Sequence, residues 1–250
     1  MRNIQLIIAY DGTEFSGWQR QQGVRTVQGC IEDALHAVHK HPVQLHGAGR
    51  TDAGVHAAAQ SAHFFTSIAS IKPENFIPAL NSALPPDVRI RAAREVPAAF
   101  HARFSAKSRA YRYHIIMGMR NLPHETRYAL QMRRIPDIAR LAAYARLLHG
   151  EIDCSLFASP SDPIFQQGSG SKFRFIHNAA FFIEHGMLVF EICANAFFRR
   201  MVRSIVGTLL FCEEHGMSAG GFAALMQSND HSSAGPTAIP NGLFLWQIEY

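Results

Sequence analysis

The sequence predicts an α+β protein made of two halves, each with the element order β-α-β-β-α-β. Its 250 residues suffice for one large or two small domains, and 48% apolar against 17% charged residues supply a sizeable core. Segments that alternate between apolar and polar residues are typical of strands. They occur in both halves, separated by stretches with helical periodicity. We therefore expect two antiparallel sheets, each with helices on one face.

The first half, residues 1–105, begins with a strand followed by a helix whose start is well marked. Thr26 is a suitable N-cap, and Val27, Ile31 and Leu35 share one apolar face of the helix that follows it. In order, the predicted elements are a strand at 3–10, a polar loop at 11–25, a helix at 26–39, strands at 42–48 and 58–66, a helix at 73–83 and a strand at 88–96.

The second half, residues 106–250, repeats this order of elements without a visible sequence repeat. Gly150 suits the position after a helix, and His185-Gly186 suits a hairpin turn. In order, the predicted elements are a strand at 109–117, a helix at 136–149, a hairpin of 173–184 and 187–194, helices at 196–214 and 218–227, and a strand at 243–250. Residues 159–172 are rich in Ser, Gly and Pro and predict a long, mobile loop.

The positive charge is concentrated in one part of the chain. The 24 basic residues are 20 Arg and 4 Lys, and with 19 acidic residues they leave a net charge of +5. Between Pro85 and Arg134, however, ten Arg and one Lys oppose three acidic residues, a balance of +8, and five Phe and Tyr residues are interleaved with them. Arg binds phosphates and stacks on bases, so the pattern is typical of a nucleic-acid-binding surface. A solvated basic face is the alternative.

The remaining composition argues against several other classes of protein. The four cysteines form no CxxC pair, which excludes zinc-ribbon and redox motifs. His36, His39 and His41 fit a solvated helix face better than a metal site. Every apolar stretch is far shorter than the ~20 residues of a membrane span, and the chain opens in a strand rather than an apolar signal core. We therefore expect a cytoplasmic protein with free thiols, no metal and no membrane association.

A glycine-rich loop, residues 46–56, contains the side chain best suited to chemistry. Its glycines allow a ligand to approach the backbone closely, and Asp52 is the only acid between Asp33 and Glu74. Nearby positive charge should keep this carboxylate ionised, which makes it a candidate nucleophile. An ordinary turn or a weak phosphate nest remains an alternative for the loop. A glycosidase would need a second carboxylate, and none is near in the sequence.

This loop resembles the active-site segment of a known enzyme family. Gly49-Arg50-Thr51-Asp52-Ala53-Gly54-Val55-His56 is similar to the corresponding run in the TruA-type tRNA pseudouridine synthases. The resemblance extends along nearly the whole chain, through Tyr10-Asp11-Gly12, residues 15–21, Thr26-Val27-Gln28, residues 100–106, Tyr111-Arg112-Tyr113, residues 195–207, and residues 234–238 with Gly242-Leu243.

The resemblance implies a fold, a reaction and roles for four residues. The fold would be two ferredoxin-like halves whose sheets join into a pseudouridine synthase fold with an Arg-lined cleft. Asp52 would be the catalytic residue, Tyr111 would stack on the target uracil, Arg203 would pair with the carboxylate, and Arg50 would help displace the target nucleotide. The enzyme would act as a homodimer, without cofactor or catalytic metal, on uridines in the anticodon arm of tRNA (tRNA positions 38–40).

Two segments depart from the family's usual pattern. After the long loop, where relatives carry an Arg-Thr or Arg-Thr-Pro element, this chain reads Gly170-Ser171-Lys172-Phe173-Arg174, which leaves Lys172 and Arg174 to supply the charge. Arg199-Arg200 stands where many relatives have an aromatic or His pair. Because Arg203 lies about one helical turn further on, we expect the chemistry to be unaffected.

The reaction itself fits the residues that the sequence offers. Pseudouridine formation breaks the N1 glycosidic bond, rotates the base and rejoins it through C5, so no redox cofactor is needed. The base must leave the helical stack at a cost of a few kcal/mol, and an aromatic ring returns ~1–3 kcal/mol per stacked base. Tyr111 could instead be a core aromatic and Arg203 a surface arginine, while Trp18 is expected to anchor the loop at 11–25.

Two other functions remain open at this point. A non-catalytic RNA-binding module would tolerate Asp52→Ala, and a nucleoside hydrolase or glycosylase would release free base. Neither the identity of the modified uridines, nor the chemical nature of the intermediate, nor dimerisation follows from the residues alone.

Overall fold

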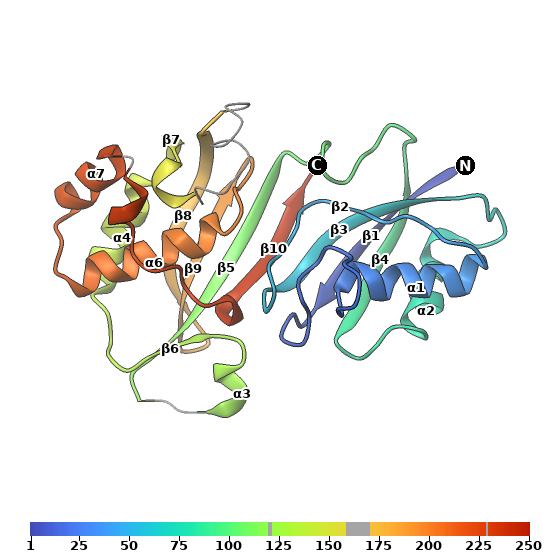
Figure 1. Cartoon of the computed structure of the whole chain (residues 1–250), viewed down its shortest axis with the longest axis horizontal. Coiled ribbons are helices and arrows are strands. Elements are labelled where there is room, and N and C mark those ends of the chain that lie inside the picture. Colours follow the sequence, from blue (N-terminus) through green and yellow to red (C-terminus); the bar gives the residue numbers. More distant parts are fainter. Residues whose placement is uncertain (120–121, 159–170, 229) are drawn as a thin grey trace. The chain divides into compact units, whose positions relative to one another are not determined.

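The computed structural model describes residues 1–119, 122–158, 171–228 and 230–250 (Figure 1). They form two compact units, the first comprising Met1–Lys107 and Phe244–Tyr250 and the second Ser108–Leu243. Both units are mixed, with helices and mostly antiparallel strands, so the predicted α+β class is confirmed at that level. Most of the predicted loop at 159–172 lies outside the described residues.

The first unit contains a sheet with strand order β4-β1-β3-β10, and the short β2 pairs with β3. Strand β1 is antiparallel to both of its neighbours, whereas β10 is parallel to β3. The elements are β1 (Arg2–Tyr10), α1 (Val27–His39), β2 (His46–Gly47), β3 (His56–Thr66), a 3-10 turn (Pro73–Asn75), α2 (Phe76–Asn81), β4 (Val88–Val96) and β10 (Leu243–Glu249).

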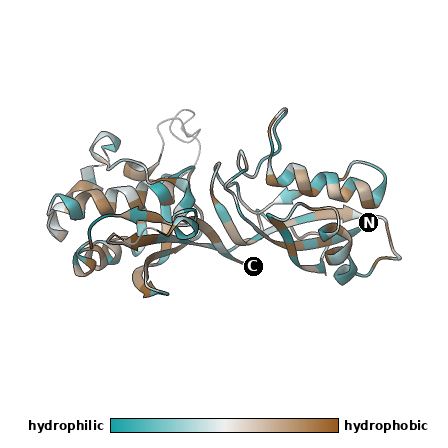
Figure 2. Cartoon of the chain, turned by 90° about the horizontal axis from the view of Figure 1, so that it is seen from below, coloured by the Kyte–Doolittle hydropathy of each residue, from teal (hydrophilic) through white to brown (hydrophobic). Residues whose placement is uncertain are grey.

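The core of the first unit lies between this sheet and its two helices. Ile4, Leu6 and Ile8 alternate along β1 and are fully buried, as the period of two predicts for a strand with one covered face. Helix α1 starts where the sequence predicted, because the Thr26 side chain accepts a hydrogen bond from the Gly29 amide. Its apolar face supplies Ile31 and other buried residues. In Figure 2 the helix carries both hydrophobic and hydrophilic residues, as expected for a helix with one buried face.

The predicted strand at 42–48 is much shorter in the structure and is reduced to His46–Gly47. The reason lies in the polar side chains of α1. The Leu45 amide donates to the Glu32 carboxylate (3.2 Å), and the Leu45 carbonyl accepts from the Gln28 amide (3.0 Å). These side chains satisfy backbone groups that a strand would otherwise bond to its neighbour. The predicted helix at 73–83 likewise divides into a 3-10 turn and the short α2.

The second unit contains an antiparallel sheet with strand order β5-β9-β8-β7, and β6 lies parallel to β5. Its elements are β5 (Ser108–Met117), α3 (Pro123–Thr126), β6 (Leu130–Met132), α4 (Ile138–Leu147), β7 (Gly150–Asp153), a 3-10 turn (Ser155–Phe157), β8 (Phe173–Glu184), β9 (Met187–Ala194), α6 (Met201–Glu214), α7 (Ala219–Ser228) and two further 3-10 turns (His231–Ser233 and Pro240–Gly242).

Helix α4 of the second unit packs on α6, on α7 and on β8 (Figure 1). The Tyr144 ring of α4 lies 4.9 Å from the Phe222 ring of α7, and both side chains are buried. Glu213 near the end of α6 is also buried. It is bound by the Arg134 guanidinium and by the Asp137 amide (2.8 Å), so this buried charge is paired.

The helix that the sequence predicts before the last part of the second half is shorter in the structure. The helix expected at 196–214 begins only at Met201, because Arg200 adopts a left-handed conformation (φ 61°) that cannot belong to a right-handed helix. The last strand forms as expected, as β10, and it pairs in parallel with β3, with Phe244 opposite His56. Among the described residues, we find no helix with the length and apolar character that crossing a bilayer demands.

Candidate active site

Asp52 lies in the loop that leads from β2 into β3. The loop starts with a hydrogen bond from the Ala48 amide to the Ser61 carbonyl (2.8 Å). It ends in a turn in which the Val55 amide donates to the Asp52 carbonyl (3.2 Å), with Gly54 at φ 76°. A positive φ at this position of the turn favours glycine. Asp52 therefore occupies the first position of a turn and is half-buried, while Arg50 beside it is exposed.

The loop at 11–25 packs directly on this segment through glycines. A Cβ atom on Gly12 would lie 2.0 Å from the Val55 carbonyl oxygen, and one on Gly17 would lie 2.7 Å from the Thr51 carbonyl oxygen. The Trp18 amide donates to that same Thr51 oxygen (3.1 Å). The absence of side chains at Gly12 and Gly17 thus lets two backbones touch next to Asp52.

Buried polar side chains hold the same loop from the sheet side. The Tyr10 hydroxyl bonds to the Thr51 hydroxyl (2.8 Å), and the Gln60 amide donates to the Gly49 carbonyl (2.9 Å). The expectation that Trp18 anchors the loop at 11–25 is confirmed. Trp18 is only 2% exposed, and its indole fills the space that a Cβ on Gly47 would enter.

His56 closes the loop and is 1% exposed. Its Nδ1 accepts the Gly12 amide (3.0 Å) and lies 3.2 Å from an Asp11 carboxylate oxygen. A nitrogen that accepts an N–H cannot also carry a proton, so we assign the neutral ring and do not count the Asp11 contact as an ion pair. The ring stacks on Phe244 of β10 at 4.6 Å, which ties the end of the loop to the last strand of this unit.

In the second unit, β5 presents Tyr111 and Tyr113 on one sheet face and Arg112 on the other. Tyr113 is fully buried, and its hydroxyl donates to the Ile239 carbonyl (2.8 Å). Burial raises the pKa of Tyr113. Tyr111 is only half-buried and meets the Phe197 ring edge to face at 5.2 Å, and Arg112 binds Glu191 and Glu184 on the opposite face. The core role thus falls to Tyr113.

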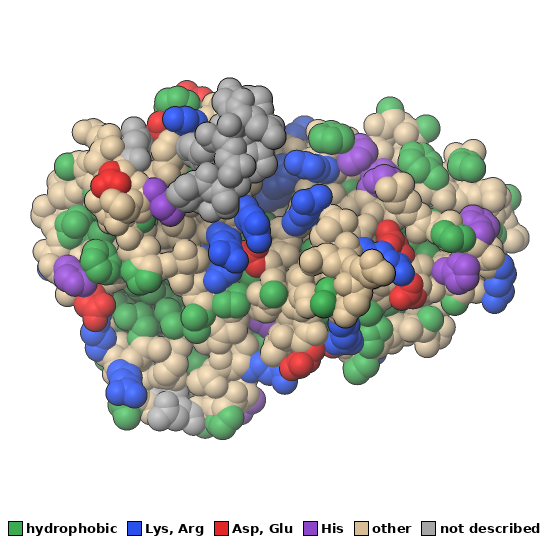
Figure 3. Space-filling model, viewed as in Figure 1, with side chains coloured by type: hydrophobic (Ala, Val, Ile, Leu, Met, Phe, Trp, Pro, Cys, Tyr) green, Lys and Arg blue, Asp and Glu red, His purple; other side chains and the backbone are tan. Residues whose placement is uncertain are grey.

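Arg203 lies in the first turn of α6, and its direction is determined by a hydrogen bond of its own. Its Nε donates to the Ala238 carbonyl (2.7 Å), and the Ala238 amide donates back to the Arg203 carbonyl (3.1 Å). The chain can approach α6 this closely because Gly207 has no side chain. A Cβ atom there would lie 1.8 Å from the Pro236 oxygen. Figure 3 shows Lys and Arg side chains gathered over the beginning of α6.

Arg174, which the sequence suggested as a charge in the loop after residue 170, packs against the protein in the structure. Its guanidinium lies 3.8 Å from the centre of the Phe198 ring and donates to the carbonyls of Ser171 and Phe173 (2.7 Å each). Lys172 is exposed. Arg174 therefore joins the start of β8 to the segment before α6, a contact for which the sequence carried no signal.

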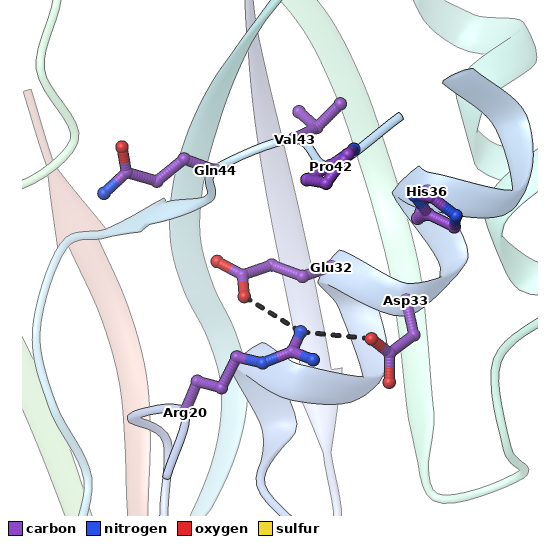
Figure 4. A pocket seen from close by; sticks show the side chains of 7 residues that line it. All are labelled: Arg20, Glu32, Asp33, His36, Pro42, Val43 and Gln44. Atoms are coloured by element: carbon purple, nitrogen blue, oxygen red, sulfur yellow. Dashed lines mark hydrogen bonds and ion pairs between the residues drawn. The ribbon is translucent and has the colours of Figure 1, made fainter. Parts of the chain in front are cut away.

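A surface hollow of about 500 Å³ also lies in the first unit (Figure 4). It is lined by Arg20, Glu32, Asp33, His36, Pro42, Val43 and Gln44. Arg20 contacts both carboxylates, at 3.2 Å from Glu32 and 3.0 Å from Asp33, and its pKa is raised chiefly by the hydrogen bond to Glu32. Two carboxylates in one hollow repel phosphate, so this hollow is a poor nucleic-acid site.

A cluster of three histidines was not anticipated from the sequence. The His63 ring lies 4.9 Å from that of His46 and 4.7 Å from that of His101. Burial, followed by the neighbouring histidines, lowers the pKa of His63 to about 4. No group of three His, Cys, Asp or Glu residues suited to a metal ion occurs within the part of the chain that the structure describes.

The four residues suggested for the reaction fall in both units. Arg50 and Asp52 share the loop of the first unit, and Tyr111 and Arg203 belong to the second. The first unit thus presents a carboxylate on a well-braced loop, and the second presents a half-buried aromatic ring on β5 and an arginine in the first turn of α6.

Comparison with known proteins identifies the family of this chain. A model of the tRNA pseudouridine synthase family matches residues 6–105 and 144–250. A "tRNA pseudouridine synthase A" of Treponema denticola is 52% identical, in an alignment covering 100% of this chain and 93% of the relative. Its namesake in Geobacillus kaustophilus is 39% identical, over 100% of this chain and 95% of the relative. The chain therefore belongs to the TruA-type tRNA pseudouridine synthases, which are enzymes of the isomerase class.

Proposed function

We propose that this enzyme converts uridine to pseudouridine in the anticodon arm of tRNA, with Asp52 as its catalytic carboxylate and without a cofactor. The observation that carries the proposal is the loop around Asp52, whose sequence matches the family's active-site segment and whose backbone is held on three sides by the contacts of Thr51, Gly49 and Val55. A reacting group needs such a fixed position, because small displacements lower the rate strongly.

The reaction is an isomerisation in which atoms balance within the nucleotide. The bond between N1 and C1′ breaks, the base rotates, C5 bonds to C1′, and the proton on C5 is lost to solvent as N1 gains one. Asp52 assists the bond cleavage by attack on the sugar or the base or by proton abstraction from the sugar, and each of these routes requires its ionised form. No electron is transferred to an external acceptor, so the chemistry needs no redox cofactor.

We assign supporting roles to the other three residues. Tyr111 stacks on the uracil once it has left the helical stack, a contact worth ~1–3 kcal/mol for a base. Arg203 pairs with the catalytic carboxylate and orients its oxygens, and Arg50 helps to displace the target nucleotide. The half-buried ring of Tyr111 and the fixed direction of Arg203 support these assignments.

The finer features of the fold and assembly are also proposals. We infer that both halves, 1–105 and 106–250, have a ferredoxin-like fold, and in the first unit the order β4-β1-β3, with β2 also paired to β3, supports this. We further infer a cytoplasmic homodimer, because the resembling enzymes act in that form on tRNA. Light scattering at micromolar concentration tests the dimer, and a monomeric mass at full activity would contradict it.

Tritium release from tRNA that carries 5-tritiated uridine tests the reaction. We expect Asp52→Asn to lower the rate of tritium release about a thousand-fold or more, which corresponds to ~4 kcal/mol of activation free energy. The affinity for tRNA should be retained. The matched control is Asp33→Asn, the same chemical change at an exposed acid of α1, which should keep wild-type release. Unchanged release in Asp52→Asn would refute the proposal. Free uracil in place of pseudouridine would indicate a glycosylase.

A further inference from the structure

The segment between β4 and β5, residues 97–107, is a well-ordered loop in the first unit. The Ser105 amide donates to the His101 carbonyl (2.9 Å), and the His101 amide donates back to the Ser105 hydroxyl (3.0 Å). The amides of Arg103 and Phe104 both point at His101 Nδ1, at 3.1 and 3.4 Å. Four hydrogen bonds within five residues therefore define the conformation of the loop tip.

The same loop is fastened to the rest of its unit at Ala102, which is fully buried. The Ala102 amide donates to His63 Nδ1 (3.1 Å), and the Ala102 carbonyl accepts from the Tyr250 hydroxyl (2.8 Å). The Asn3 side chain of β1 donates to the carbonyls of Pro97 and Phe100 (3.1 and 2.9 Å). The loop tip is thus held at a defined place on the sheet.

This ordered loop presents a large aromatic ring to solvent. Phe104 is 76% exposed, the highest value among the large apolar side chains of the described residues after the terminal Met1. One side of the ring is backed by His101, with ring centres 4.4 Å apart, and the Arg103 guanidinium lies 5.6 Å from the ring centre. A preorganised ring loses little conformational entropy when a ligand stacks on it.

The charges around the ring select the kind of ligand. Residues 97–107 include Arg103 and Lys107 and no acidic residue. The His101 ring stays neutral near pH 7, because burial and the charges of His46 and Arg103 lower its pKa. An apolar aromatic face next to a guanidinium suits a flat base attached to a phosphate, since the base stacks and the arginine binds the phosphate.

We infer that Phe104 and Arg103 form a platform on which an unpaired nucleobase of tRNA stacks, a base other than the uracil that reacts. The inference rests on the proposed function, which supplies tRNA as the ligand. The platform shares a unit with Asp52, and the His101 ring lies 5.6 Å from that of His46, where the catalytic loop begins. Stacking here would orient the tRNA against the unit that carries the carboxylate.

Binding of an unmodified tRNA transcript to the full-length protein tests the platform. We expect Phe104→Leu, which keeps an apolar side chain but removes the π face, to weaken the affinity about 5- to 150-fold, the equivalent of ~1–3 kcal/mol of stacking. Phe104→Trp keeps the face and should stay within about threefold of wild type, and the fluorescence of the new tryptophan should be quenched by tRNA. The matched control is Phe65→Leu on β3, at a side chain that is 39% exposed, and it should bind like wild type.

Two outcomes would overturn the inference. One is wild-type tRNA affinity in Phe104→Leu. The other is a Phe104→Leu variant whose sedimentation shows a changed oligomeric state, because the ring would then be covered by a second copy of this chain rather than by a base. If wild-type protein neither binds tRNA nor releases tritium, the proposed function fails; if wild type does both and Phe104→Leu behaves identically, only the platform fails.

Discussion

The loop around Asp52 and the first turn of α6 around Arg203 are held in different ways. In the loop, hydrogen bonds fix the main chain before the carboxylate, at the carbonyls of Gly49 and Thr51, and after it, where the Val55 amide donates to the Asp52 carbonyl. At α6, the functional side chain is itself held, because Arg203 Nε donates to the Ala238 carbonyl. In both regions a glycine allows two backbones to come close.

This difference fits the proposed roles of the two groups. A carboxylate that reacts must be carried to the right place yet still change its bonding during the reaction, which bracing of the main chain permits. An arginine that only supplies a positive charge works best with its guanidinium held in one orientation, because preorganised charge needs no rearrangement when the transition state forms. Substitutions around Asp52 should therefore lower activity by displacing the backbone of the loop, whereas at α6 they should do so by removing or moving the Arg203 side chain.

Among the substitutions that compare these two regions, the largest effect on turnover is expected from Arg203→Met, which removes the held side chain. Turnover should fall about 100-fold or more, corresponding to ~3 kcal/mol, with folding largely kept because the side chain is only half-buried. Arg199→Met, at an exposed arginine just before α6, should lower turnover much less. Tritium release measured at saturating enzyme gives both rates. Wild-type turnover in Arg203→Met would remove the role assigned to this residue.

Gly207→Ala tests the close approach behind Arg203. Alanine usually favours a helix over glycine by up to ~1 kcal/mol, but here the new Cβ would lie 1.8 Å from the Pro236 oxygen. We expect a net loss of about 3 kcal/mol in the free energy of unfolding, the upper range for overpacking. In urea titrations, Gly220→Ala in α7 should instead raise the free energy of unfolding, because the nearest atom to its new Cβ is 3.9 Å away. Equal signs would contradict the packing argument.

Gly17→Ala tests the bracing of the Asp52 loop. Gly17 has φ 91°, and its Cβ would lie 2.7 Å from the Thr51 oxygen, whereas Gly23 has φ 77° with nothing within 4 Å. Both alanines incur the cost of a left-handed conformation, ~1–2 kcal/mol, so the difference between them isolates the contact with Thr51. We expect Gly17→Ala to be less stable than Gly23→Ala by about 1 kcal/mol and, unlike it, to lower turnover. Identical behaviour of the two variants would show that the contact does not position Asp52.

An effect of pH on stability is expected from the histidine cluster beside the same loop. In the unfolded chain His63 has an ordinary pKa of about 6.5, and burial lowers the folded value to about 4. The unfolded state therefore binds more protons in this range, so stability is full above pH 6.5 and decreases as the pH falls toward 4. At pH 5 the loss is about 1–2 kcal/mol. Urea titrations at pH 7.5 and pH 5 should show this loss of stability. In the His63→Gln variant, the difference in stability between the two pH values should be smaller.

Much of the local structure could be predicted from the sequence because its causes are local. Thr26 caps α1 and His185-Gly186 forms the hairpin turn, both as expected, whereas α4 ends at Leu147 and Gly150, expected directly after that helix, is the first residue of β7. The glycine-rich loop at 46–56 could also be identified from the sequence, since its residues depart from any regular periodicity. The contacts that hold this loop in place could not be predicted from the sequence, because they come from Gly12 and Gly17, which belong to a separate loop of the chain.

The differences between prediction and structure arise where distant residues compete with local preference. The strand at 42–48 gives way to side chains of α1, and Arg200 delays the start of α6 in spite of a helical pattern around it. In the sequence, Phe104 is only one of several aromatic residues in a basic stretch. Its exposure on an ordered loop depends on His63 and Tyr250, which lie far from it in sequence.

The amino-acid sequence by itself determined the class of protein, the positions of most helices and strands, and the residue types available for catalysis, since hydrophobic period, capping and glycine placement act over a few residues. Tertiary structure alone decided that the last strand joins β3, that Tyr113 rather than Tyr111 is the core aromatic, and that His46, His63 and His101 meet. Those outcomes depend on strand partners and on burial, both of which are set by residues distant along the chain.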